Sequence, residues 1–228
     1  MFISLDGIDG AGKSTQIDLL RQHLEAKGAS VVCFRDPGST KLGEAIREIL
    51  LHREDIPLAN TSEMLLYMAA RAQLVAEQLR PALDAGATVI CDRFLLANVV
   101  YQGVAGGLNI DDLWAIGFCA TGGLSPDATI VLDIDPEVAV KRLQRGPDRL
   151  EKRGIEYFRL VRKGFLDQIS HAGRQVMVVN ADQKIEQIHQ QIAEFIDQLP
   201  TGSFRNEGKP ASPPVFLKNK KSNPNFHS

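Results

Sequence analysis

The stretch Gly7-Ile8-Asp9-Gly10-Ala11-Gly12-Lys13-Ser14, followed by Thr15, decides the fold. It stands between an apolar run at 2–5 and an amphipathic segment that begins at Lys13. Its glycine spacing lets the backbone curl around phosphate oxygens, with amide hydrogens pointing inward at a helix N-terminus. We therefore expect residues 7–15 to bind a nucleoside triphosphate, with Lys13 bridging the β- and γ-phosphates and Ser14 ligating Mg²⁺. A glycine turn with a solvated lysine is the alternative, and the flanking patterns argue against it.

Outward from this loop, short runs of β-forming residues alternate with longer segments of helical periodicity. The alternation predicts an α/β fold with a five-stranded parallel sheet and helices on both faces, and the loop places it in the P-loop NTPase class. Strands are expected at 2–5, 30–34, 87–92, 128–134 and 175–179, and helices at about 13–27, 43–52, 60–85, 110–121, 136–144, 154–172 and 183–198.

Length and composition predict one globular domain with a tail. The chain has 228 residues and a formal net charge of −2, so it has no general attraction for nucleic acid or anionic membranes, and neither is expected as a partner. The domain is expected over 1–200. Residues 201–228 are rich in Ser, Asn, Pro and Lys and lack periodicity, which predicts disorder.

The cysteines and the start of the chain bear on its location. Cys33, Cys91 and Cys119 are odd in number and lack the spacing of a zinc site or a redox pair, which fits a reducing compartment. No charged leader or long apolar stretch precedes the loop. We therefore expect a cytoplasmic location.

An aspartate ends the strand predicted at 87–92. Asp92 should lie at the carboxyl end of a strand beside the loop, where it can hold Mg²⁺ or its water shell. A turn or a helix cap is the ordinary alternative. The adjacent Arg93 favours the functional interpretation, because its planar fork of donors suits the phosphate of an acceptor.

Arginines further along the chain separate kinases from other proteins with this loop. The Asn-Lys-x-Asp motif with which guanine-specific switches recognise their base is absent. The only Asn-Lys pair in the sequence, Asn219-Lys220, lies in the tail. Small-molecule kinases often carry arginines on a lid that closes over the transferred phosphoryl group. In the basic segment 141–153, Gly146-Pro147 interrupts the helix, so we expect a lid at about 144–154 with Arg145 and Arg149 on a bend. A solvated helix face is the alternative.

The order of these motifs resembles that of the thymidylate kinase family over about residues 1–198. The resemblance implies a nucleoside monophosphate kinase-like P-loop fold, phosphoryl transfer from MgATP to the 5′-phosphate of dTMP, and a homodimer. The motifs that carry it are the loop of the Asp-Gly-x-Gly-Lys-Ser-Thr-Gln kind, Arg35-Asp36-Pro37-Gly38, Tyr67 with Arg71, Asp92-Arg93-Phe94, Tyr101-Gln102 and the basic segment ending in Asp148-Arg149-Leu150-Glu151.

The resemblance implies roles for residues around the phosphates. Arg35 and Arg93 would hold the 5′-phosphate of the acceptor, and Asp9 would accept a hydrogen bond from its 3′-hydroxyl. Lys13 and Arg93 would stabilise the charge on the transferred group. One class of the family places a further catalytic arginine in the loop and the other places it in the lid. Gly10 occupies the loop position, so the chain resembles the bacterial class, in which the lid residues Arg145 and Arg149 assist transfer.

Further roles concern the base and the sugar. Tyr67 resembles the aromatic residue on which thymine stacks, and Arg71, four residues later on the same helical face, would donate to a base carbonyl. Core packing among neighbouring apolar residues is the alternative for Tyr67. Asn98 or Gln102 would read the remaining polar edge of the base, and Tyr101 would crowd the 2′ position of the sugar.

Two other functions stay open from the sequence. The chain could be another nucleoside monophosphate kinase, with Tyr67 and Arg71 serving a different base. It could also be a P-loop protein that uses its nucleotide as a regulatory switch.

Overall fold

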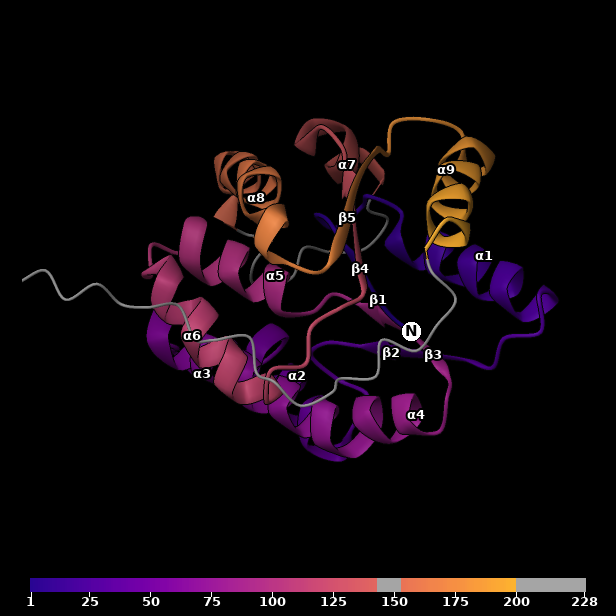
Figure 1. Cartoon of the computed structure of the whole chain (residues 1–228). Coiled ribbons are helices and arrows are strands. Elements are labelled where there is room, and N and C mark those ends of the chain that lie inside the picture. Colours follow the sequence, from indigo (N-terminus) through magenta and orange to yellow (C-terminus); the bar gives the residue numbers. More distant parts are fainter. Residues whose placement is uncertain (143–152, 200–228) are drawn as a thin grey trace, which may run out of the picture.

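Five parallel strands form the centre of the molecule, in the order β2-β3-β1-β4-β5 (Figure 1). The structure is a computed structural model and describes residues 1–142 and 153–199. The predicted parallel sheet is confirmed, and each strand lies within one residue of its expected bounds. The strands are β1 (Phe2–Asp6), β2 (Val31–Arg35), β3 (Thr88–Asp92), β4 (Ala128–Asp133) and β5 (Gln175–Asn180).

Helices connect the strands and cover the sheet. The described α-helices are α1 (Lys13–Ala26), α2 (Lys41–Leu51), α3 (Asn60–Leu74), α4 (Arg80–Asp84), α5 (Leu95–Asn98), α6 (Ile110–Thr121), α7 (Pro136–Arg142), α8 (Ile155–Gln168) and α9 (Ile185–Asp197). α8 ends in a 3₁₀ turn, Ile169–His171. The helix predicted over 60–85 is α3 and α4 joined by a π-helical segment, Val75–Leu79. α5 continues into a second π-helical segment, Val99–Val104, and the sequence predicted neither.

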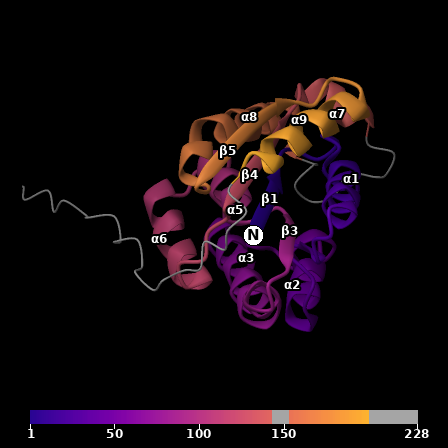
Figure 2. The same ribbon diagram turned by 45° about the vertical axis from the view of Figure 1, so that its right-hand side comes forward.

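The helices form two groups on opposite sides of the molecule. α7, α8 and α9 lie at the top of the view, and α2 and α3 lie at the bottom, both before and after rotation (Figures 1 and 2). α1 packs against β1, β2 and β3 and against α9. The expectation of helices on both faces is therefore confirmed.

Burial differs between the central strand β1 and the edge strand β5. All five of its residues are buried, because helices cover both faces of a parallel sheet. β5 is an edge strand, and its Val176 and Val178 are 39% and 45% exposed.

Across residues 1–142 and 153–199, no helix has the length and apolar character that a bilayer crossing requires.

The strand register positions the site. Asp92, the last residue of β3, pairs with Leu5 of β1 on one side and with Arg35 of β2 on the other. Because the strands are parallel, their carboxyl ends meet at one edge, where ligands of open α/β sheets bind. The loop that follows β1 leaves the sheet at this edge.

Candidate active site

The loop between β1 and α1 has the geometry of a phosphate cradle. Gly12 takes a left-handed conformation, with φ of 94°, immediately before α1 begins at Lys13. Gly10 also has a positive φ of 82°, and a Cβ there would lie 2.2 Å from the carbonyl oxygen of Ala139. No side chain fits at Gly10 without moving α7. The loop therefore lies in close contact with α7 at Gly10.

Lys13 lies folded over its own loop. Its Nζ donates to the carbonyl oxygens of Gly7 and Ile8 at 3.1 and 3.0 Å, and it lies 3.7 Å from Asp9 Oδ1. Burial, together with the charge of Arg93, lowers the pKa of the Lys13 ammonium. The cation is thus held beside the backbone that would surround the donor phosphates.

Asp92 and Ser14 fit a magnesium ion that is shared with phosphates. Both residues line the cavity over the loop, which we call the loop cavity. Asp92 Oδ1 is buried and has no hydrogen-bond partner among the described residues. No cluster of three or more His, Cys, Asp or Glu side chains suited to a metal occurs in residues 1–142 and 153–199. Mg²⁺ usually binds one or two protein ligands, waters and substrate phosphates, and the Asp92 carboxylate with the Ser14 hydroxyl fits such a donor set.

A second aspartate lies beneath the loop. Asp6, at the end of β1, is fully buried, and its Oδ2 accepts a hydrogen bond from Ser4 Oγ at 2.7 Å. Burial raises the pKa of Asp6 to about 6, although the Ser4 bond and the charges of Arg93 and Lys13 oppose the shift.

Arg93 connects the loop to a second cavity. It has a left-handed φ of 68°, uncommon for a residue other than glycine. Its Nη2 donates to Asp9 Oδ1 at 2.9 Å and to the Tyr101 hydroxyl at 3.3 Å. Burial alone lowers the pKa of Arg93, but Tyr101, Asp9, Asp92 and Asp6 more than offset that effect, so the net shift is upward. Arg93 Nη1 is buried and has no partner among the described residues.

This second cavity, which we call the base cavity, brings most of the predicted acceptor residues together. It adjoins the loop cavity, because Asp9 and Arg47 line both. Its lining is Asp9, Asp36, Pro37, Arg47, Leu51, Tyr67, Arg71, Arg93, Ala97, Asn98, Tyr101 and Gln102.

Arg71 is held rigidly in the wall of this cavity. It is 1% exposed, and its Nε donates to Asp36 Oδ2 at 2.6 Å. Its Nη1 donates to Asn98 Oδ1 at 2.9 Å, and its Nη2 donates to the Phe94 carbonyl at 3.3 Å. Asp36 is thus an anchoring partner for Arg71, a role that the sequence did not predict for it.

The two tyrosines line the base cavity from different elements. Tyr67 belongs to α3 and packs with Ile46, Leu50 and Ala70, so it is part of the core as well as of the cavity wall. Tyr101 belongs to the π-helical segment after α5, and the Arg93 guanidinium lies 5.0 Å from the centre of its ring. Burial raises the pKa of Tyr101 well above its ordinary value, which keeps the hydroxyl neutral.

Two arginines, Arg35 and Arg47, line these cavities in ways that the sequence did not predict. Arg35 lines the loop cavity but not the base cavity, and its Nη2 pairs with Glu44 at 3.0 Å. Arg47 lines both cavities and donates to the Pro37 carbonyl at 3.0 Å. Arg47 was not predicted as a site residue, because it has the pattern of an ordinary polar residue within the helix expected at 43–52.

The basic segment is described only at its margins. Arg145 and Arg149 lie outside the described residues, as does most of the lid expected at 144–154. Arg142, just before this segment, lines the loop cavity and donates to the carbonyl of Ala181 and to Asp182. Arg153, just after it, pairs with Glu63 of α3 at 3.0 Å.

Comparisons with known proteins agree on one family. A family model described as "Thymidylate kinase" matches residues 5–192. A thymidylate kinase of Rhodopirellula baltica is 46% identical over 191 residues, covering 84% of this chain and 78% of the relative. A thymidylate kinase of Symbiobacterium thermophilum is 44% identical over 209 residues, covering 91% of this chain and 98% of the relative. A third, from Caldanaerobacter subterraneus subsp. tengcongensis, is 41% identical, with 89% and 97% covered.

Proposed function

This chain belongs to the thymidylate kinase family and phosphorylates dTMP as an ATP-dependent nucleoside monophosphate kinase, and we propose that each of its two adjoining cavities holds one substrate. ATP would lie in the loop cavity and dTMP in the base cavity. The observation that carries this assignment is the junction of the two cavities at Asp9 and Arg47. Beside it, Asp92 lines one cavity and Arg93 the other, and each has a buried polar atom without a partner in the described part of the chain.

In the loop cavity, protein groups would position the donor. The backbone amides at the start of α1 and the Lys13 ammonium would hold the phosphates of ATP, with residues 7–15 surrounding them. Ser14 and Asp92 would hold Mg²⁺, which neutralises negative charge on the phosphates when it is bound. Because Lys13 is already buried against its own loop, its charge is placed before the substrate arrives.

In the base cavity, protein groups would position the acceptor. Arg93 and Arg35 would bind its 5′-phosphate from the junction side, with Arg47 as an additional cation, and Asp9 would accept from the 3′-hydroxyl. That phosphate is ionised at neutral pH, so no strong general base is required, and positioning with charge neutralisation carries the catalysis. The lid residues Arg145 and Arg149 would complete the neutralisation.

The remaining groups of the base cavity would select the nucleoside. Thymine would stack on Tyr67, Arg71 would donate to a base carbonyl, and Asn98 or Gln102 would read the neighbouring polar edge. Tyr101, neutral and in contact with Arg93, would occupy the space of a ribose 2′-hydroxyl.

We also propose a cytoplasmic homodimer. Three free thiols, Cys33, Cys91 and Cys119, support a reducing compartment. The homodimer rests on the family resemblance alone. The domain limits of 1–200 and the disorder predicted for 201–228 rest on composition and periodicity, and residues 200–228 lie outside the described part of the chain.

Initial rates with a panel of acceptors test the assignment of the base cavity. With ATP and Mg²⁺ present, kcat/KM for dTMP should exceed that for dUMP by about 10- to 200-fold, because one methyl group in an apolar pocket is worth about 1–3 kcal/mol. The value for dCMP should be lower still, since its base edge reverses donor and acceptor. AMP and GMP should give no measurable transfer. A preference for either purine would overturn the assignment.

A further inference from the structure

A line of hydrogen bonds runs from the base cavity into the protein interior. Asn98 accepts from Arg71, and its Nδ2 donates to Gln102 Oε1 at 2.8 Å. Gln102 Nε2 in turn donates to Glu63 Oε1 at 2.9 Å. We call Arg71, Asn98, Gln102 and Glu63 the amide relay. Three of its members line the base cavity, whereas Glu63 lies behind it and is 3% exposed.

The two ends of the amide relay fix the orientation of the amides between them. Arg71 can only donate, so the group that Asn98 turns toward it must be its oxygen. Glu63 Oε1 accepts from Arg153 as well as from Gln102, so the group that Gln102 turns toward it is its NH₂. Reversing either amide would place two donors or two acceptors together in a buried site, which costs about 1–3 kcal/mol for each unmade bond.

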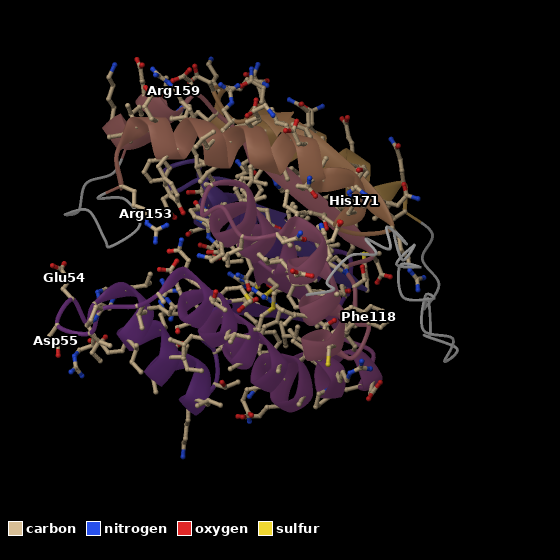
Figure 3. The ribbon with its side chains drawn as sticks, turned by 90° about the vertical axis from the view of Figure 1, so that its left-hand side faces the viewer. Glu54, Asp55, Phe118, Arg153, Arg159 and His171 are labelled. Atoms are coloured by element: carbon tan, nitrogen blue, oxygen red, sulfur yellow. The ribbon has the colours of Figure 1, made fainter. Side chains whose placement is uncertain are left out.

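Arg153 supplies the charge that Glu63 needs in this position. Its Nη2 donates to both Glu63 oxygens at 3.3 and 3.0 Å, and its Nη1 donates to the Tyr157 hydroxyl at 3.2 Å. Figure 3 shows Arg153 reaching inward from the start of α8, while Arg159 points away from the molecule. Without such a partner, the carboxylate would be an uncompensated buried charge.

We propose that Glu63 is a positioning residue that holds the donor and acceptor pattern of Gln102, as Arg71 holds that of Asn98, and thereby contributes to selectivity for thymine over cytosine. Glu63 lies behind the cavity lining and acts only through Gln102. Thymine presents a carbonyl oxygen and an N–H on the edge where cytosine presents an amino group and an unprotonated ring nitrogen. An amide held in one orientation matches the hydrogen-bonding edge of thymine alone, whereas an amide that is free to turn over matches the edges of both bases. This inference rests on the proposed place of the base in this cavity.

The test compares Glu63→Gln with the wild type in the same acceptor assay. The substitution keeps the size of the side chain but lets it donate as well as accept, so the orientation of Gln102 is then imposed only from the Asn98 side. We expect the ratio of kcat/KM for dTMP to that for dCMP to fall by about tenfold or more, mainly through KM, while the KM for ATP stays within about twofold.

Three variants separate this role from a general loss of packing. Glu63→Asp keeps an acceptor and should retain most of the selectivity. Arg153→Gln removes the charge partner of Glu63 and should lower the ratio in the same direction as Glu63→Gln. Glu25→Gln makes the same change in the exposed ion pair with Arg21 and should alter nothing. If Glu63→Gln does not fold, Arg153→Gln takes its place as the test, because Arg153 contacts Glu63 and lines neither cavity.

Two results separate the proposed role of Glu63 from the proposed place of the base in this cavity. A folded Glu63→Gln enzyme with the wild-type dTMP to dCMP ratio would overturn the inference and leave the base cavity in place. A wild-type enzyme without a preference for dTMP over dCMP would overturn the assignment of the cavity itself.

Discussion

At the scale of single residues, the carboxylates around the loop differ in their environments. Asp92 is at the protein–solvent boundary beside the loop cavity, whereas Asp6 is sealed beneath the loop with one oxygen bonded to Ser4 and the other without a partner in the described residues. Burial raises the pKa of Asp6 from 3.8 to about 6. Folding therefore favours its protonated form, and this has a measurable effect on stability.

The stability of the protein should depend on pH through Asp6. Because its pKa is higher in the folded state, the contribution of Asp6 to the free energy of unfolding is fully present below pH 3.8 and is lost as pH rises through about 6. The loss is on the order of 3 kcal/mol. Asp6→Asn removes this titration, so the variant should lose less stability than the wild type between pH 4.5 and pH 7.5.

Denaturant unfolding at the two pH values measures this difference. The quantity compared is the change in the free energy of unfolding between the two pH values. A packing cost of the new amide that is equal at both pH values does not alter this change. Asp18→Asn, at an exposed position on α1, controls for the loss of one acidic group. Equal pH dependence in the wild type and Asp6→Asn would show that Asp6 is not the group responsible.

Most of the residues that line the two cavities were predicted from the sequence as candidate site residues, but their contacts with one another were not. Lys13, Asp92 and Arg93 were found because glycine spacing and strand ends give local signals. The role of Arg71 came from resemblance, and its contact with Asp36 spans 35 positions in the chain. Arg47 gives no local signal, because only the docking of α2 beside the loop turns it into the cavity wall. Long-range contacts of this kind cannot be deduced from local periodicity.

At the scale of elements, irregular helices position two of the residues that we propose bind the acceptor. Tyr101 and Gln102 lie in the π-helical segment Val99–Val104, and π-helical bulges occur frequently at functional sites. The sequence did not predict this segment, because its apolar run fits a strand or a buried helix equally well. The helix over 60–85 was predicted as one element, because helical periodicity alone does not reveal the π-helical insertion at Val75–Leu79.

The close approach of the loop to α7 gives a prediction at this scale. A methyl group at Gly10 would meet the Ala139 carbonyl at 2.2 Å, so Gly10→Ala must displace the loop or the helix. Because a misplacement of about 1 Å can cost about 100-fold in rate, we expect kcat/KM for ATP to fall by that order. Steady-state kinetics at saturating dTMP measures the effect.

Gly28→Ala is the matched control for this substitution. Gly28 also has a positive φ, of 85°, but a Cβ there meets nothing within 4 Å. Its substitution should cost about 1–2 kcal/mol of stability from the backbone conformation alone and leave the kinetics unchanged. A similar, small kinetic effect at both positions would contradict the proposed role of the contact between Gly10 and α7.

At the scale of the whole molecule, the parallel sheet brings the two cavities together. The carboxyl ends of β1, β2 and β3 place Asp6, Arg35 and Asp92 at one edge, and the helices that follow provide the walls. The alternation of strand and helix patterns predicted this arrangement correctly, because it depends on local propensity and on the rules for parallel connections. The junction at Asp9 and Arg47 required the packing of α2 as well.

The central claim is that donor and acceptor occupy separate cavities, and calorimetric titration of dTMP and of ATP tests it most directly. The double variant Asp36→Asn with Arg71→Gln removes both charges of the buried pair, so neither is left uncompensated. The control is Arg21→Gln with Glu25→Gln, which removes an exposed pair on α1. We predict that the first double variant binds dTMP at least about tenfold more weakly and ATP within about twofold of the wild type. Unchanged dTMP binding, or an equal loss for both nucleotides, would contradict the account.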